Sequence, residues 1–449
     1  MSRLMVSISG LRGEIGLTLT PSVILRYTQA FAKFVNGGKV ILGRDSRVSG
    51  PFIADLVRGA LVAGGCQVID IGIVPTPTVQ LEVEHHGAAG GIAITASHNP
   101  IQWNGLKFMG ADGRFLPPDQ AEQVYEMADQ NQALLQTWDH LGEVLFDDQA
   151  IQRHIEKVLN ISYLNVEAIR KRKFKVAVDT VNGAGGRIIP QLLEALGCQV
   201  IAINQETNGR FAHTPEPLPE NLTQLSQAVR QNQADLGFAV DPDVDRCAIV
   251  DNEGQPIGEE YTLVIAVKLI LSKQLGRVVV NMSTSRASED IARYYNCLFE
   301  RSKVGEINVA EKMKELEAIV GGEGNGGVIL PEVHLGRDAP VAVALTLQAL
   351  LEHGGTMKEL KEALPQYEMV KKKVSIEGLN PEEILQRLQE KYKDHEINTL
   401  DGLKIDFEKS WVHLRKSNTE PIMRVIAEAP TLQQAEELAA RLMKEITEK

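Results

Sequence analysis

The chain has 449 residues, 43% of them hydrophobic and 24% charged, with 38 glycines and 19 prolines. This composition is typical of a folded globular protein of about three domains, and it excludes a disordered or fibrous chain. The 47 basic and 59 acidic residues give a net charge of −12, which argues against nucleic acid or an anionic membrane as the main partner, because both bind basic surfaces.

The first residues lack the apolar stretch of a signal peptide, and polar residues interrupt every apolar run before it could span a membrane. The best candidate, residues 261–272, contains Lys268. We therefore expect a cytoplasmic protein. The four cysteines include no Cys-x-x-Cys pair, so we expect reduced thiols that bind no zinc.

A pattern that recurs along the chain predicts three related α/β units. In each copy a helix ends near Gly or Asn and a short apolar strand follows; the copies are residues 61–69, 193–201 and, more faintly, 294–299. A second apolar strand is expected upstream of each copy, at residues 39–42, 175–178 and 277–280. Strand, helix and strand repeated in this way favour parallel or mixed sheets.

The last part of the chain has a different pattern. Two apolar segments, 411–414 and 423–426, flank a polar loop, and a terminal helix is expected to begin at Thr431. We expect a small α+β domain there. The patterns together predict four domains, at residues 1–150, 151–253, 254–365 and 366–449.

The first candidate site is the serine loop, residues 95–100, which follows the apolar segment 91–94. Ligands of α/β sheets bind where strands end, so Ser97 is a candidate nucleophile with an exposed hydroxyl. An ordinary turn before proline is the alternative. Lys107 follows closely and is a candidate proton donor or phosphate anchor, unless it is simply an exposed lysine.

The second candidate is the aspartate loop, residues 241–246, where three carboxylates alternate after an apolar strand at 236–240. Without a cation they would repel one another. A calcium loop of the EF-hand type is excluded, since Arg246 and Asn252 stand where that loop needs Gly and Glu. We therefore expect Mg²⁺, with Arg246 neutralising phosphate charge; aspartates of a plain turn are the alternative.

The glycine loop, residues 322–327, matches the dinucleotide pattern G-x-G-x-x-G. A strand-like segment follows it instead of a helix, so a dinucleotide site is not expected. Glu323 and Asn325 suit hydrogen bonds to sugar hydroxyls, and a glycine-rich turn is the alternative.

The hairpin loop, residues 415–421, is rich in groups that bind phosphate. The candidate phosphate ligands are Arg415, Ser417, Asn418, Thr419 and, beyond the loop, Arg424. A solvated basic hairpin is the alternative. No Walker A motif is present, so the phosphate is expected on a small substrate and not on ATP.

These loops, in this order and over nearly the whole chain, resemble those of the α-D-phosphohexomutase family. Segments 9–13 and 43–47 also resemble family segments that place arginines, such as Arg12, near a phosphoserine. The resemblance implies three similar α/β domains with mixed sheets plus a smaller C-terminal α+β domain around a central cleft. It implies a small sugar phosphate as the partner, and a monomer or homodimer.

The resemblance also implies a mechanism. Ser97, carried as phosphoserine, would donate its phosphoryl group to a hexose monophosphate, and a hexose 1,6-bisphosphate would serve as intermediate and activator. Mg²⁺ would be held by the side chains of Ser97, Asp241, Asp243 and Asp245. The catalytic candidates are Ser97, Lys107, His98 and Arg12. The alternatives are a serine-dependent sugar phosphatase and a catalytically silent binder of sugar phosphates.

Family glycine loops commonly carry Ser where Asn325 stands and His where Gly327 stands. His334, a few residues downstream, is therefore a candidate replacement. The Gly-Asn-Gly-Gly form is similar to that of the archaeal-type phosphoglucosamine mutases, and segments 281–283 and 303–306 resemble theirs. A carboxylate at Glu306 would favour a substrate ammonium, so we expect glucosamine phosphate as substrate, with glucose or mannose phosphate as the alternative.

Overall fold

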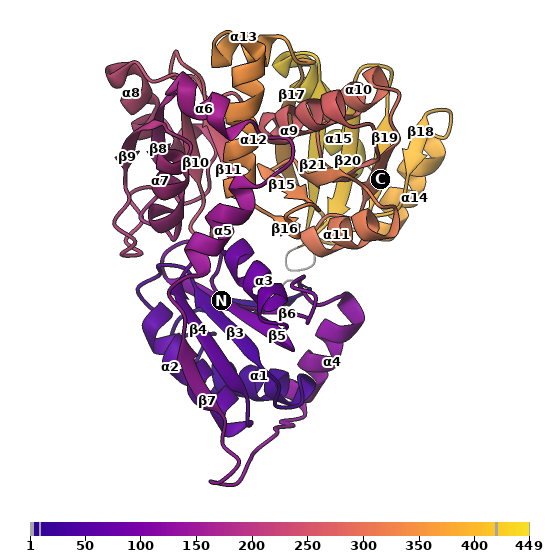
Figure 1. The fold of residues 1–449 in the computed structure, drawn as a ribbon. Helices are drawn as coiled ribbons and strands as arrows, with labels where there is room; N and C mark the ends of the chain where they lie inside the picture. Colours follow the sequence, from indigo (N-terminus) through magenta and orange to yellow (C-terminus); the bar gives the residue numbers. More distant parts are fainter. Residues whose placement is uncertain (1–3, 9, 418–420, 449) are drawn as a thin grey trace.

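The computed structural model describes residues 4–8, 10–417 and 421–448. In these residues the chain forms four sheets, one after another along the sequence (Figure 1). The first sheet and its helices lie below the other three groups in the view of Figure 1.

The first sheet has seven strands in the order β1-β2-β6-β5-β3-β4-β7 and is mixed. Its strands are β1 (Met5–Ser7), β2 (Gly10–Glu14), β3 (Val40–Arg44), β4 (Gln67–Ile73), β5 (Gly90–Ile94), β6 (Trp103–Met109) and β7 (Glu143–Phe146). Its helices are α1 (Pro21–Phe34), α2 (Gly50–Ala63), α3 (Thr76–His85) and α4 (Pro118–Asp129).

The second sheet has the order β11-β10-β8-β9, with only β11 antiparallel to its neighbour. Its strands are β8 (Lys175–Asp179), β9 (Gln199–Ile203), β10 (Leu236–Val240) and β11 (Cys247–Val250). The helices of this part are α5 (Ala150–Leu159), α6 (Val166–Arg172), α7 (Gly185–Ala195), the 3₁₀ turn η1 (Pro219–Asn221) and α8 (Thr223–Asn232).

The third sheet has the order β13-β12-β14-β15-β16 and is also mixed. Its strands are β12 (Val278–Asn281), β13 (Phe299–Ser302), β14 (Val320–Glu323), β15 (Gly327–Leu330) and β16 (His334–Arg337). Its helices are α9 (Glu260–Lys273), α10 (Arg286–Tyr294), α11 (Glu306–Glu315), α12 (Ala339–His353) and α13 (Met357–Glu362).

The fourth sheet is antiparallel, in the order β17-β21-β20-β19-β18. Its strands are β17 (Glu368–Ser375), β18 (Glu396–Asn398), β19 (Leu403–Asp406), β20 (Trp411–Lys416) and β21 (Ile422–Ala429). Two helices accompany it, α14 (Pro381–Lys391) and α15 (Leu432–Thr447). The fold class expected from the sequence is therefore confirmed.

The recurring sequence pattern corresponds to three parallel strand pairs, each joined by a helix. The pairs are β3 and β4 joined by α2, β8 and β9 joined by α7, and β12 and β13 joined by α10. The first expected domain boundary, between residues 150 and 151, falls at the start of helix α5, whose apolar face is buried. The exact domain boundaries stay a prediction.

The first three units share a hydrophobic core, whereas the fourth has its own. One cluster of buried side chains runs from Ile41 to Leu364 and includes the apolar residues of helix α9. The core of the fourth unit contains only residues between Val370 and Ile446. Among the described residues, no helix combines the length and apolarity that crossing a membrane requires.

Polar contacts connect the fourth unit to the third. Arg286 Nη2 donates to Asp406 Oδ1 at 2.9 Å, and Ser283 Oγ and His413 Nδ1 lie 2.9 Å apart. Lys371 forms an ion pair with Glu259 across the same junction. This interface therefore resembles the polar surfaces found between domains that move relative to each other.

Candidate active site

One cleft of about 360 Å³ receives side chains from all four units. The loops after β5 and β10, the β14–β15 hairpin and strands β20 and β21 each contribute to it. In the first three units these loops leave the carboxyl ends of strands, where α/β sheets bind ligands. The candidate residues that line the cleft are Arg12, His98, Lys107, Arg246, Glu306, Glu323, Asn325, Arg415 and Arg424.

Ser97 is buried and not exposed, contrary to the expectation from the sequence: only 1% of its surface is accessible. Its φ of 49° lies in the left-handed region and its backbone N–H donates to Thr95 Oγ1 at 2.9 Å. The hydroxyl donates to Asp241 Oδ2 at 3.1 Å and lies 3.3 Å from His98 Nδ1. The loop thus places the hydroxyl at the edge of the aspartate loop.

Arg47 holds the serine loop in shape, a role that the sequence did not reveal. The fully buried guanidinium donates from Nη2 to the carbonyl oxygens of Ser97 at 2.6 Å and Asn99 at 2.7 Å. Its Nε pairs with Asp45 at 3.1 Å. Segment 43–47 therefore contributes an arginine that contacts backbone carbonyl groups of the serine loop and not the hydroxyl oxygen of Ser97.

Each carboxylate of the aspartate loop has one anchored oxygen. Asp241 Oδ1 accepts from backbone N–H groups of the same loop at 3.1 and 3.2 Å. Asp243 Oδ2 accepts from Lys107 Nζ at 2.7 Å, and Asp245 Oδ2 accepts from Arg337 Nη2 at 2.6 Å. The other oxygens of Asp243 and Asp245 are buried without a hydrogen-bond partner.

These free oxygens fit a divalent cation. Ligand atoms of the three aspartates lie within 4.8 Å of one another, and all three residues are buried. Burial and the charges of Asp245 and Asp243 raise the pKa of Asp241 well above its usual value. Because oxygen ligands without a partner are costly in a buried site, the loop has the chemistry that Mg²⁺ requires.

Lys107 is not the exposed lysine of the alternative interpretation. It lies on β6, is 1% exposed, and its ammonium also approaches Asp245 at 3.5 Å. Arg12 lies nearby on β2 and donates to Asn99 Oδ1 at 3.3 Å. Lys107 therefore adds positive charge beside the aspartate loop, and Arg12 adds it beside the serine loop.

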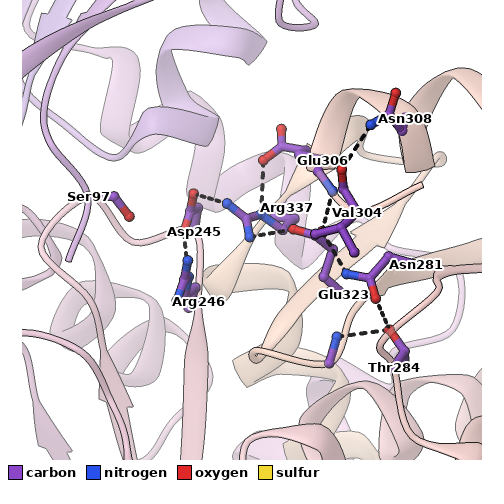
Figure 2. A network of polar contacts seen from close by, with 12 residues as sticks. Ser97, Asp245, Arg246, Asn281, Thr284, Val304, Glu306, Asn308, Glu323 and Arg337 are labelled. Atoms are coloured by element: carbon purple, nitrogen blue, oxygen red, sulfur yellow. Dashed lines mark hydrogen bonds and ion pairs between the residues drawn. The ribbon is translucent and has the colours of Figure 1, made fainter. Parts of the chain in front are cut away.

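Glu323 of the glycine loop is held by three donors. They are Asn281 Nδ2 at 2.7 Å, the backbone N–H of Gly305 at 2.9 Å and Arg337 Nη1 at 2.7 Å (Figure 2). Asn325 Oδ1, in the same loop, is buried without a partner. One fixed carboxylate and one free amide oxygen are suited to binding sugar hydroxyls.

Two other candidates have partners within the protein. Glu306 accepts from Gln80 Nε2 at 3.1 Å and from Arg337 Nε at 3.0 Å, and burial raises its pKa. His334 Nε2 lies 2.9 Å from Asp338 Oδ2 and does not line the cleft. The structure therefore does not place His334 in the cleft beside the glycine loop.

The hairpin loop is partly described. Arg415 and Arg424 reach the cleft from adjacent strands, and Arg415 Nε donates to Asp401 Oδ1 at 2.9 Å. The backbone N–H of Ser417 donates to the carbonyl of Ile422 at 2.9 Å. Asn418 and Thr419 lie outside the described residues.

Models of a single protein family match successive parts of the chain. They are the phosphoglucomutase/phosphomannomutase alpha/beta/alpha domains I, II and III, over residues 3–134, 152–254 and 258–367, and the C-terminal domain, over residues 370–445.

Proteins from several organisms are similar to the chain over almost their whole length. A "Probable phosphoglucosamine mutase" of Methanopyrus kandleri is 37% identical over 96% of this chain and 95% of its own. A "Phosphoglucomutase/phosphomannomutase" of Thermococcus kodakarensis is also 37% identical, over 97% of both chains. The crystal structure of a phosphoglucomutase/phosphomannomutase family protein from Burkholderia thailandensis superposes with a TM-score of 0.84 at 26% identity, covering 98% of each chain.

We predict that His98 stays neutral through the physiological pH range when Ser97 carries no phosphate. Burial, with the nearby charges of Arg246 and Arg12, lowers the pKa of His98 to about 2. The imidazole NMR signal that disappears in a His98→Gln variant should therefore not shift between pH 8 and about 5. A titration of that signal with a midpoint near the ordinary histidine value would contradict the prediction.

Proposed function

The chain belongs to the phosphoglucomutase/phosphomannomutase family and is a phosphohexomutase, and from this premise we propose that Ser97 carries the phosphoryl group that moves between the two ends of a hexose phosphate. The observation that carries the proposal is the position of Ser97 Oγ, 3.1 Å from a carboxylate of the buried aspartate loop, next to His98, which lines a cleft that Arg415 and Arg424 also line. The two arginines reach this cleft from the fourth unit, so they suit the phosphate at the substrate's far end.

The exchange proceeds in two transfers. A sugar hydroxyl attacks the phosphorus of phosphoserine; the bond between phosphorus and Ser97 Oγ breaks, and a hexose 1,6-bisphosphate forms. After the bisphosphate turns over, Ser97 Oγ attacks its other phosphate and the product leaves as the isomeric monophosphate. The same bisphosphate, bound from solution, would phosphorylate an unmodified Ser97 and so activate the enzyme.

Two side chains lie beside the serine and aspartate loops. The ammonium of Lys107 lies 2.7 Å from Asp243 Oδ2 and 3.5 Å from Asp245 Oδ2, so it suits the acid or the neutralising role. His98 Nδ1 lies 3.3 Å from Ser97 Oγ and suits orienting that oxygen, because its lowered pKa makes the imidazole a weak base. Mg²⁺ bound by Ser97 phosphate, Asp241, Asp243 and Asp245 would supply charge neutralisation.

We propose glucosamine phosphate as the preferred substrate. Supports are the name of the Methanopyrus kandleri relative and the resemblance of segments 281–283 and 303–306 to phosphoglucosamine mutases. Glu306 lines the cleft, and a substrate ammonium there would share its oxygens with Arg337 and Gln80. The name of the Thermococcus kodakarensis relative supports the alternative, glucose or mannose phosphate as substrate.

Replacing Ser97 by Ala should lower turnover by roughly 1,000-fold or more, because the only change is loss of the oxygen that carries the phosphoryl group. Intact-mass analysis should show one phosphoryl group on the parent after incubation with hexose 1,6-bisphosphate and none on the variant. The control is Ser226→Ala, which removes a buried serine hydroxyl on α8. Parental activity in the Ser97 variant would remove Ser97 from the mechanism.

Removing the cation should mimic the loss of one aspartate. We expect Asp243→Asn to lower kcat by roughly 100-fold or more, because the cation loses one charged ligand. Chelation should abolish activity reversibly, because it removes the cation itself. Calorimetry with Mg²⁺ should show binding to the parent and to a control, Asp251→Asn, whose carboxylate caps a turn outside the cleft. Full activity in the presence of chelator would contradict the assignment.

A panel of hexose phosphates decides the substrate. The 1- and 6-phosphates of glucosamine, N-acetylglucosamine, glucose and mannose should all be tested, and we expect the highest kcat/KM for glucosamine, by roughly tenfold. A higher value for glucose or mannose would replace the amino-sugar assignment by the alternative. Release of free sugar and inorganic phosphate instead of the isomer would indicate a phosphatase.

A further inference from the structure

At Gly327, the first residue of β15, the surrounding side chains leave no room for a Cβ atom. The φ of this glycine is not in the left-handed region, so its backbone would accept other residues. A Cβ atom at this position would lie 2.3 Å from Cδ and 2.9 Å from Cγ of Arg337. The side chain of Arg337 therefore occupies the volume that any larger residue at position 327 would fill.

Arg337, the last residue of β16, uses that space to reach the cleft. It is 8% exposed, and its three nitrogens contact three carboxylates: Nε to Glu306 at 3.0 Å, Nη1 to Glu323 at 2.7 Å and Nη2 to Asp245 at 2.6 Å. Figure 2 shows the guanidinium between these groups. A planar guanidinium fixes the directions of its partners, which a lysine ammonium cannot do.

The partners of Arg337 belong to different loops. Asp245 lies in the aspartate loop after β10, Glu323 lies at the start of the glycine loop, and Glu306 begins helix α11. Asp245 keeps its other oxygen free for a cation, and Glu323 keeps its place through Asn281 as well. The backbones of the two loops also meet, since Cys247 N donates to the carbonyl of Gly326 at 3.0 Å.

We propose that Arg337 is a positioning residue for the phosphoryl transfer: entering through the space left by Gly327, it fixes the carboxylate that would hold the cation relative to the carboxylate that would hold the sugar. The proposal rests on the proposed function. Transfer needs the reacting oxygen and phosphorus close together and in line, so a small displacement between the two loops lowers kcat strongly. Gly327 is then as necessary as Arg337 itself.

The test uses four full-length proteins: the parent, Gly327→Ala, Arg337→Ala and the double variant. Gly327→Ala should lower kcat at saturating substrate and Mg²⁺ by at least tenfold, since the new methyl group displaces the guanidinium. Added to Arg337→Ala, the same methyl group should change kcat less than twofold, because the arginine atoms that it would overlap are gone and only Asn325 Oδ1, at 3.2 Å, remains among the three nearest atoms. The control, Gly110→Ala, adds a methyl group at a buried turn whose nearest atoms lie 3.6 Å away, and should stay within twofold of the parent.

The same four proteins give a readout that needs no substrate. Gly327→Ala should lower the thermal unfolding midpoint in the parent background and much less in the Arg337→Ala background. A parent that does not interconvert hexose phosphates would overturn the proposed function, while these midpoints would still report the contact. Equal midpoint losses in both backgrounds would overturn the inference at its structural step.

The functional step has its own contrary outcomes. An active parent with unchanged kcat in Gly327→Ala, a change confined to KM, or an equal kcat loss in both backgrounds would each overturn the inference. Where Arg337→Ala does not fold, Arg337→Lys replaces it in the activity test. Lysine keeps the charge, but its compact ammonium lacks the planar fork that fixes the directions of the three carboxylates, so a kcat at least tenfold below the parent supports the proposal and parental kcat overturns it.

Discussion

Electrostatic repulsion among the three aspartates of the loop after β10 is the constraint on which the cleft depends. Three carboxylates with ligand atoms within 4.8 Å of one another, all buried, are stable only when cations and hydrogen-bond donors surround them. The first unit supplies Lys107 and the hydroxyl of Ser97, and the third supplies Arg337. The three units are thus held together at the point where their chemistry converges.

Strands, loops and helices that depend on a local sequence pattern could be predicted from the sequence. The strand 236–240 and the loop after it form as expected, because an apolar run followed by Asp-rich turn residues is a local signal. The terminal helix, the glycine-loop hairpin and the strands that flank the hairpin loop follow from the same kind of pattern. The serine loop could be predicted from its position after β5. The burial of the Ser97 hydroxyl could not, because Ser97 adopts a left-handed φ that composition does not reveal.

The contacts of Arg47 and Arg337 could not be found in the same way. Resemblance places segment 43–47 near the phosphoserine, but these contacts are made with partners far away in the sequence: Asn99 for Arg47, and Asp245 for Arg337. His334 shows the opposite case, since it stands near the glycine loop in sequence but pairs with Asp338, the first residue after strand β16. Gly327 was the one sequence feature that pointed to Arg337. From the sequence it suggests only that a histidine is missing, whereas in the structure it leaves space for the side chain of Arg337.

The separate core of the last unit has a consequence for how the cleft exchanges its contents. Because the hydrophobic cluster of the fourth unit contains no residue of the other units, and the contacts described with the third unit are hydrogen bonds and an ion pair, an outward movement of this unit would leave that cluster intact. Water replaces each broken contact, so the free-energy cost stays small compared with that of breaking a shared core. In such a movement Arg415 and Arg424 would travel with the unit, whereas the aspartate loop would stay in place. Under the proposed mechanism, a bisphosphate would then be released at one end, turn over and be bound again, while the groups around Ser97 would keep their geometry.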